Sequence, residues 1–189
     1  FSRSQRSPGV IKSGTLYYPY WLAQAAGLLE KQGFRVALID APARRLKSAE
    51  ASALVKKLAP RLVVVEASTP SIENDIEFTR KIKQAHVDAY TCLVGTHPTI
   101  EAENILSGTP EIDMIARGEY DMTLLEIARS LKSGAPYQAL AGISCRQGAR
   151  VMHNAPRGHI EDLDAIPFVS AVYKRHLDIR NYYFSIVKN

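Results

Sequence analysis

Polar and glycine residues that could bind a ligand lie in four short loops, each of which follows an apolar run. By residue type, His97 and Glu119 are the best candidates for acid–base work or for metal ligation. Two such ligands more than 20 residues apart, with no partner at short spacing, make a poor metal site. We therefore expect no bound metal, and we expect His97, at a helix start beside a proline, to orient its neighbours through hydrogen bonds. The four loops are 40–45, 67–71, 95–99 and 117–121.

The small residues of these loops suit the close approach of a ligand. Gly95 and Gly118 follow their apolar runs directly, and a residue without a side chain lets a flat or phosphorylated ligand reach the backbone. Ser68, Thr69 and Ser71 place hydroxyls where a helix begins. Each has an ordinary structural explanation when taken singly, because serine and threonine cap helices and glycine turns the chain. Four such loops at one edge of a sheet favour a ligand site.

Apolar runs alternate with segments of helical periodicity, which predicts an α/β fold with a doubly wound parallel sheet. The runs are nearly continuous, as in strands that are buried on both faces. Ligands of such sheets bind at the carboxyl ends of the strands, so we expect the four loops to rim the main cavity there. The expected strands are 34–39, 62–65, 90–94 and 113–116, and the expected helices are 20–32, 48–58, 71–84, 100–106 and 121–132.

Towards the C-terminus the pattern changes. Two short runs, 140–146 and 150–154, flank a glycine-bearing turn and predict a β-hairpin. The chain beyond them is punctuated by prolines and then becomes aromatic and basic. We therefore divide the chain into a Rossmann-like (flavodoxin-like) domain over 1–154 and an irregular linker over 155–189. No strong strand precedes the first helix, so we expect the first strand of the domain to be missing from this chain.

Composition narrows the classes of function. The 189 residues are 46% hydrophobic and 23% charged, which is ordinary for a soluble globular protein. No apolar stretch reaches the roughly 20 residues that a membrane-spanning helix needs, and residues 1–13 are polar and basic, unlike a secretory signal. Cys92 and Cys145 form no CxxC pair, which favours a reducing cytoplasm. The net charge of +5 is scattered and accompanies no nucleic-acid-binding motif, so we expect a cytoplasmic protein without nucleic-acid partners or a membrane span.

Several segments, taken in order, match a known pattern. Residues 94–99 read Val-Gly-Thr-His-Pro-Thr, residues 116–121 read Ala-Arg-Gly-Glu-Tyr-Asp, and residues 160–168 lead into Ile-Pro-Phe through two Asp residues. With the segments 13–19 and 33–42, they resemble the N-terminal region of cobalamin-dependent radical S-adenosylmethionine enzymes. That family includes methyltransferases and the anaerobic cyclase that acts on magnesium-protoporphyrin IX monomethyl ester.

The resemblance implies a cobalamin-binding domain with the corrinoid on the carboxyl edge of the sheet. In the related methionine-synthase type domain, an Asp-x-His-x-x-Gly motif supplies the lower cobalt ligand. Here Asp40 matches, but Pro42 stands at the histidine position and Arg45 at the glycine position, so the resemblance implies cobalamin without a protein histidine ligand. The cofactor-binding residues that it implies are Asp40, Pro42, Ser68, Thr69, Ser71, Gly95, Thr96, His97, Gly118 and Glu119.

The radical chemistry of that family requires three cysteines in a CxxxCxxC motif to hold a [4Fe–4S] cluster. This chain has two cysteines, so we expect no catalytic residue in it. The resemblance places the cluster and S-adenosylmethionine in a missing C-terminal barrel of a parent enzyme, of methyltransferase or cyclase type. One alternative is a cofactor-free flavodoxin-like interaction or regulatory module. Another is an enzyme that acts alone on a small substrate, against which the lack of a paired acid–base or nucleophile motif argues.

Overall fold

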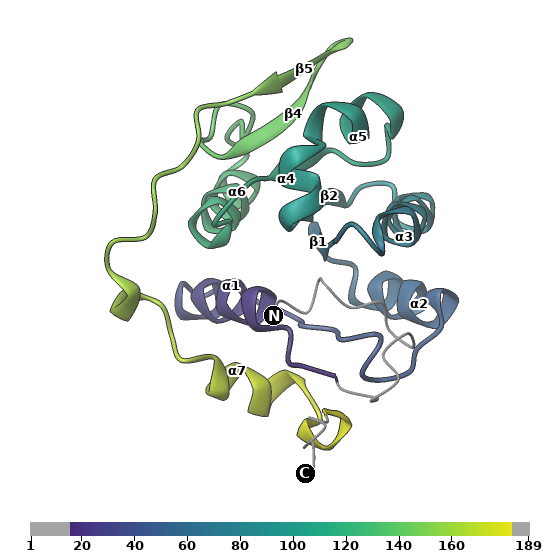
Figure 1. The fold of residues 1–189 in the computed structure, drawn as a ribbon, viewed down its shortest axis with the longest axis vertical. Coiled ribbons are helices and arrows are strands. Elements are labelled where there is room, and N and C mark those ends of the chain that lie inside the picture. Colours follow the sequence, from purple (N-terminus) through teal and green to yellow (C-terminus); the bar gives the residue numbers. More distant parts are fainter. Residues whose placement is uncertain (1–15, 183–189) are drawn as a thin grey trace, which may run out of the picture.

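The computed structural model describes residues 16–182, which form an α/β fold with helices on both sides of one sheet (Figure 1). Strands β1 to β3 are parallel, and β4 and β5 extend the sheet as an antiparallel hairpin. The Rossmann-like fold and its C-terminal hairpin are therefore confirmed. The strands, in their order across the sheet, are β1 (Leu62–Glu66), β2 (Tyr90–Val94), β3 (Met114–Ala116), β4 (Ile143–Gln147) and β5 (Arg150–His153).

The helices divide between the two faces, with α1 and α6 on one side of the strands and α2, α3 and α5 on the other (Figure 1). Four predicted helices are confirmed to within a residue or so at each end, whereas the fifth, at 100–106, is two short helices, α4 and α5. The helices are α1 (Tyr20–Lys31), α2 (Ser48–Leu58), α3 (Ile72–Ala85), α4 (Thr96–Ile100), α5 (Ala102–Gly108), α6 (Asp121–Ser133) and α7 (Val169–His176), with single 3₁₀ turns at Leu163–Ala165 and Ile179–Asn181.

The core consists of two apolar layers, one on each face of the sheet. Cys92 and Val94 of β2 pack with Leu124 of α6, whereas Leu93 between them packs with Ile105 of α5. The side chains of one strand thus enter both layers, which is why the strands read as continuous apolar runs. Cys92 is fully buried, and this burial raises the pKa of its thiol to about 12, so it serves as a small hydrophobic packing residue.

The predicted strand at 34–39 is wrong for the described structure, in which this segment pairs with no strand. The sheet ends at β1, and a cavity is lined by 34–39 on one side and by 62–65 on the other. A strand needs a neighbour for its backbone hydrogen bonds. Instead, the Leu38 amide lies 3.4 Å from the imidazole Nδ1 of His176 in α7.

The segment after the hairpin is not irregular throughout, because it contains α7, which packs on α1. Val172 of α7 is fully buried with Ala23 and Ala26 of α1. The end of α7 is held by Glu30 of α1, which accepts a hydrogen bond from Arg175 and lies 2.7 Å from Nε2 of His176. Helix α7 of this segment therefore covers α1.

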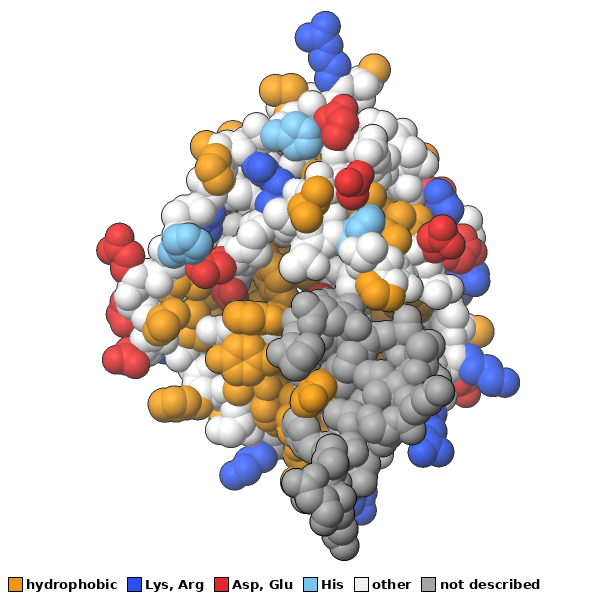
Figure 2. Space-filling view, in the orientation of Figure 1, with side chains coloured by type: hydrophobic (Ala, Val, Ile, Leu, Met, Phe, Trp, Pro, Cys, Tyr) orange, Lys and Arg blue, Asp and Glu red, His pale blue; other side chains and the backbone are white. Residues whose placement is uncertain are grey.

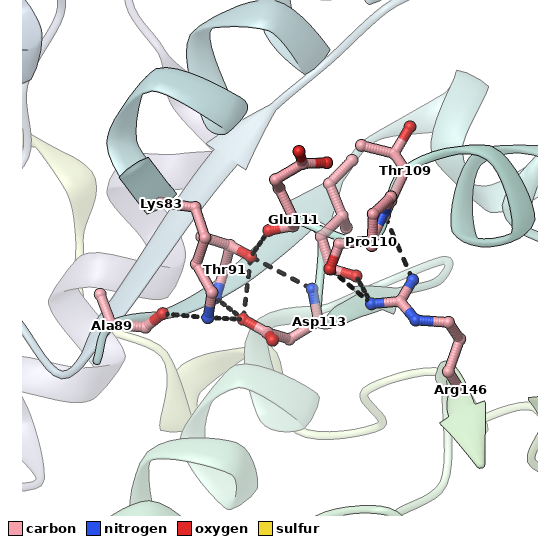
Figure 3. A network of polar contacts seen from close by, with 9 residues as sticks. Lys83, Ala89, Thr91, Thr109, Pro110, Glu111, Asp113 and Arg146 are labelled. Carbon is pink, nitrogen blue, oxygen red and sulfur yellow. Dashed lines mark hydrogen bonds and ion pairs between the residues drawn. The ribbon is translucent and has the colours of Figure 1, made fainter. Parts of the chain in front are cut away.

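A polar network fixes the amino ends of β2 and β3 (Figure 3). Lys83 Nζ lies 2.9 Å from Oδ2 of Asp113, and the same oxygen accepts the Thr91 amide at 2.7 Å. Arg146 of β4 binds the segment that connects α5 to β3 through four carbonyl oxygens, those of Leu106, Thr109, Pro110 and Ile112. The network lies at the opposite end of the strands from the polar loops, and it fixes the positions of β2, β3 and β4.

Candidate functional site

The loops that follow β1, β2 and β3 meet at the carboxyl edge of the sheet. His97 Nδ1 lies 3.1 Å from Thr69 Oγ1, which joins the first two loops and is the kind of contact expected of an orienting histidine. Thr99 Oγ1 accepts the Gly118 amide at 3.1 Å and donates to the Gly95 carbonyl at 2.7 Å, which joins the second and third. The structure thus brings three of the four predicted loops together. The segment 95–99 was predicted as a loop, but only Gly95 is non-helical, because α4 begins at Thr96. The connection that Thr99 makes has no signal in the residue types.

Two glycines of this edge differ in their surroundings. Gly95 has φ +114°, and a Cβ atom there would lie 2.3 Å from the Ala67 carbonyl oxygen, so only glycine fits. Gly118 has φ +67°, and a Cβ atom on it would meet no other atom within 4 Å among the described residues. Gly95 therefore lets the β1 and β2 loops touch at the backbone, whereas Gly118 leaves open space at the edge.

A chain of hydrogen bonds links the β1 loop to α3. The hydroxyls of Ser68 and Ser71 lie 2.9 Å apart, and Ser71 donates to Oδ2 of Asp75 at 2.7 Å. Burial raises the pKa of Asp75 to about 6, although the hydrogen bonds from the two serines oppose the shift. Asp75 was not among the predicted site residues; the available signal was its spacing of four residues from Ser71, which places both on one helix face.

A second buried carboxylate stands at the start of α6. Asp121 is 5% exposed, and its Oδ1 has no hydrogen-bond partner among the described residues. Burial, followed by the nearby negative charge of Glu119, raises the pKa of Asp121 to about 6. Glu119 itself accepts the Ile160 amide at 3.1 Å and lies 3.2 Å from Nδ1 of His159, so it holds the linker against this edge.

The fourth loop, 40–45, is fixed by the C-terminal segment. Asp40 is buried; its Oδ1 accepts the Ala43 amide at 3.1 Å, and its Oδ2 accepts the Tyr182 hydroxyl at 2.6 Å. Pro42 is exposed and has no side-chain nitrogen or oxygen that could ligate a metal. The contacts of Asp40 are thus those of a residue that shapes its loop.

The prediction that the four loops rim the main cavity is wrong for the larger of the two described cavities. This cavity, of about 650 Å³, runs along β1 and the segment 34–39, and of the four loops only Ala41 lines it. The smaller one, of about 270 Å³, lies against Arg61, Tyr90 and the end of α6. The three joined loops therefore lie outside both described cavities, and they form a surface on which a broad ligand could rest.

Within residues 16–182, no three histidine, cysteine, aspartate or glutamate side chains are placed to share a metal ion. No helix in the same range is long and apolar enough to cross a membrane. Both cysteines, Cys92 and Cys145, are unpaired and buried in the core.

The sequence is similar to one protein-family model and to several known proteins. The sequence model of the B12 binding domain matches residues 6–128. An uncharacterized methyltransferase of Pyrococcus horikoshii is 27% identical over 157 residues, which cover 83% of this chain and 34% of that protein. An anaerobic magnesium-protoporphyrin IX monomethyl ester cyclase of Rubrivivax gelatinosus is 30% identical over 158 residues, 78% of this chain and 28% of that protein.

Two solved structures share the fold. The cobalamin-dependent S-adenosylmethionine radical enzyme OxsB with aqua-cobalamin bound gives a TM-score of 0.69 at 16% identity, over 80% of this chain and 22% of OxsB. The second is the radical S-adenosylmethionine methyltransferase TsrM from Kitasatospora setae, with cobalamin and a [4Fe-4S] cluster bound. Its TM-score is 0.66 at 18% identity, and the match covers 82% of this chain and 29% of TsrM. The chain thus spans about a third or less of each of these relatives.

Proposed function

Because this chain belongs to the B12-binding domain family, we propose that its three joined carboxyl-edge loops hold the corrinoid of a B12-dependent radical S-adenosylmethionine enzyme. The domain resembles the B12-binding domains of such enzymes in fold. The observation that carries the proposal is the pair of contacts from His97 to Thr69 and from Thr99 to Gly118, which make one surface from three loops.

The groups on this surface fit cobalamin. The corrin ring carries amide side chains and its nucleotide tail carries a phosphate, so both need hydrogen-bonding partners. Ser68 offers a buried hydroxyl, and the unpartnered Oδ1 of Asp121 can accept from an amide. Bound cobalamin supplies a cobalt centre that carries alkyl groups or electrons, and the protein supplies its binding and orientation. The proposed contacts are Asp121 and the predicted binding residues of the three joined loops, which are Ser68, Thr69, Ser71, Gly95, Thr96, His97, Gly118 and Glu119.

Under the proposal, cobalamin would bind without a histidine of this chain on its cobalt. Pro42, where the related motif has histidine, offers no ligand atom. The two histidines at the edge, His97 and His159, contact Thr69 and Glu119 through Nδ1. We assign cobalamin binding without a protein imidazole on the ground of Pro42.

The radical step belongs to a further part of the polypeptide. The relatives are about three or more times as long as the matched segment, and a [4Fe-4S] cluster and S-adenosylmethionine would bind in a C-terminal barrel that covers the corrinoid. Glu119 accepts the Ile160 amide and so holds the segment after the hairpin beside the carboxyl edge. A barrel that followed this segment would start close to the proposed corrinoid surface. Figure 2 shows hydrophobic side chains gathered over the α1 region, where Tyr20 and Trp21 are each nearly half exposed. Such a surface fits an interdomain contact in a cytoplasmic methyltransferase or cyclase.

Two tryptophan substitutions test the position of the corrinoid. Thr96→Trp adds a bulky side chain at an exposed position of the edge, whereas Ser107→Trp adds the same side chain at an exposed position of α5. After incubation with hydroxocobalamin and desalting, the absorbance of Thr96→Trp should show at least a tenfold loss of affinity, about 1.4 kcal/mol. Ser107→Trp should retain cobalamin like the unsubstituted chain. Equal retention by both variants would remove the corrinoid from this edge.

A further inference from the structure

The side chains of Ser68, Ser71 and Asp75 form a hydrogen-bonded relay that ends at the carboxyl edge of the sheet. Ser71 Oγ lies 2.7 Å from Oδ2 of Asp75 and 2.9 Å from Oγ of Ser68. Ser68 lies in the loop after β1, Ser71 directly precedes α3, and Asp75 is in the first turn of that helix. The relay therefore connects a partly buried carboxyl group of α3 to a hydroxyl of the proposed corrinoid surface.

When Asp75 is ionised, only one arrangement of the hydroxyl protons satisfies the relay. A carboxylate can only accept hydrogen bonds, so Ser71 must donate its single hydroxyl proton to Asp75. The Ser71 oxygen can then only accept, and the hydrogen bond between the two serines must use the hydroxyl proton of Ser68. The Ser68 amide lies 3.3 Å from the same Ser71 oxygen and can donate to its other lone pair. Ser68 Oγ therefore offers a ligand its lone pairs and no proton.

Protonation of Asp75 reverses the direction of both side-chain hydrogen bonds in the relay. The carboxylic acid donates to Ser71, and Ser71 donates to Ser68 Oγ, which at 2.9 Å is closer than the Ser68 carbonyl oxygen at 3.4 Å. The hydroxyl proton of Ser68 is then released for a ligand. Ser68 is 3% exposed, so bulk water does not readily replace a partner that the relay withholds. The protonation state of Asp75 thus sets the hydrogen-bonding polarity of Ser68.

The protonation of Asp75 is controlled by burial and hydrogen bonds. Helix α3 packs on α2, β1 and β2, whose side chains toward it are apolar, namely Val55, Val63, Val65 and Leu93. The charged side chains of these elements are exposed, paired with other groups or turned away, namely Glu50, Lys56 and Lys57 of α2, Glu73, Glu77, Arg80, Lys81 and Lys83 of α3, and Glu66 of β1, which lies beside Tyr120. On the neighbouring loop, the titratable group is His97, which contacts Thr69. Burial raises the pKa of Asp75 to about 6 against the hydrogen bonds from Ser71 and Ser68, so both protonation states are populated between about pH 5 and 7.

We propose that Asp75 is a positioning residue that acts through Ser71 on Ser68, which accepts a hydrogen bond from the ligand when Asp75 is ionised and donates one when Asp75 is protonated. The identity of the ligand rests on the proposed function. At neutral pH, Ser68 then accepts from an N–H group, such as a carboxamide of the corrin ring, and disfavours a group that can only accept, such as the phosphate of the nucleotide tail. Cobalamin binding should therefore weaken as the pH falls and Asp75 takes up its proton.

An NMR titration of the full 189-residue chain tests the relay without cobalamin. The carboxyl carbon of Asp75 reports its protonation, and the Cβ resonance of Ser68 should shift with the same midpoint, near pH 6. In Ser71→Ala the Ser68 resonance should lose this inflection while Asp75 still titrates. Ser71→Thr, which keeps a hydroxyl, should retain it. A Ser68 resonance that does not follow Asp75 in the unsubstituted chain, or that still follows it in Ser71→Ala, would overturn the proposal.

The affinity for hydroxocobalamin at about pH 5 and pH 7 tests the ligand group assigned to Ser68. From pH 7 to pH 5 the unsubstituted chain should lose about three- to tenfold more affinity than Ser71→Ala, because about nine tenths of Asp75 is protonated at pH 5. The titrations of the ligand, His97 and Asp121 are common to both chains and cancel in this comparison, and Ser71→Thr should behave like the unsubstituted chain. An equal loss in Ser71→Ala, or tighter binding at pH 5 by the unsubstituted chain relative to Ser71→Ala, would overturn the proposal.

Failure of the relay and failure of the proposed function give different results. A folded chain that binds no cobalamin at either pH, although its Ser68 resonance follows Asp75, would contradict the proposed function and with it the ligand group assigned to Ser68. A chain that binds cobalamin, but whose Ser68 resonance does not follow Asp75, would overturn the relay and leave the proposed function in place.

Discussion

A Cβ atom on Gly95 would lie 2.3 Å from the carbonyl oxygen of Ala67, so the loops after β1 and β2 touch at the backbone. No flexible side chain separates them, and the contact leaves no room for relaxation by a rotamer change. A larger residue at this position would therefore disturb the packing of the two loops before it met any ligand. Gly95 is a structural requirement of the proposed cobalamin surface.

Gly95→Ala should destabilise the protein by about 2–3 kcal/mol or more, because it adds an overpacking clash to an unfavourable backbone conformation. Gly118→Ala is the matched control, since Gly118 also has a positive φ but open space around it. It should lose only about 1–2 kcal/mol. Urea unfolding measures the free energy of unfolding of both variants. Equal losses in this free energy would show that the close approach to Ala67 does not add to the cost at Gly95.

The contribution of Asp75 to stability should fall as the pH rises from about 4 to 6. The pKa of Asp75 is about 6 in the folded protein, above its usual 3.8, so in this range the folded state keeps a proton that the unfolded state has lost. The contribution is up to about 3 kcal/mol. Asp75→Asn should flatten this slope in urea unfolding followed across the pH range, although Asp121 contributes in the same direction.

Cobalamin bound to this chain should have no imidazole from the protein on its cobalt. Pro42→Ala and His97→Ala should therefore leave the position of the visible absorption bands of the bound corrinoid unchanged. His97→Ala should weaken retention, because it removes the contact with Thr69 that joins two loops. A shift of the bands in His97→Ala would identify that histidine as a ligand and contradict the assignment.

Arg146→Lys should destabilise the protein by about 2 kcal/mol. The guanidinium satisfies four carbonyl oxygens between α5 and β3, and a lysine ammonium cannot reach them all in the same geometry (Figure 3). Arg150→Lys at the exposed start of β5 is the control and should have little effect. Thermal unfolding compares the two, and a stable Arg146→Lys would show that the four contacts are dispensable.

The fold was largely predictable because its strongest signals are local. The apolar runs at 62–65 and 90–94 and the helix at 48–58 depend on periodicity and on capping residues, and they are confirmed. The segment 34–39 has an equally apolar sequence, but a strand also needs a paired neighbour, which the described sheet does not provide. Helix α7 was not predicted, since it depends on its packing against α1.

The proposed site was predictable as a set of loops but not as a set of contacts. Strand–loop order places the loops at 67–71, 95–99 and 117–121 at one edge, and the contacts of His97 and Thr99 show them joined. The role of Asp75 depends on burial, and the role of Glu119 depends on a linker about 40 residues further along the chain. Neither burial nor long-range contact is encoded in the residue types alone.

Cobalamin retention is the most direct test of the central claim. The chain is incubated with hydroxocobalamin, desalted and examined by ultraviolet–visible spectroscopy. The predicted result is that the chain retains about one corrinoid per molecule. Thr96→Trp should lose the corrinoid, and Ser107→Trp should keep it. Absence of corrinoid from the folded chain would contradict the account and favour a cofactor-free interaction module.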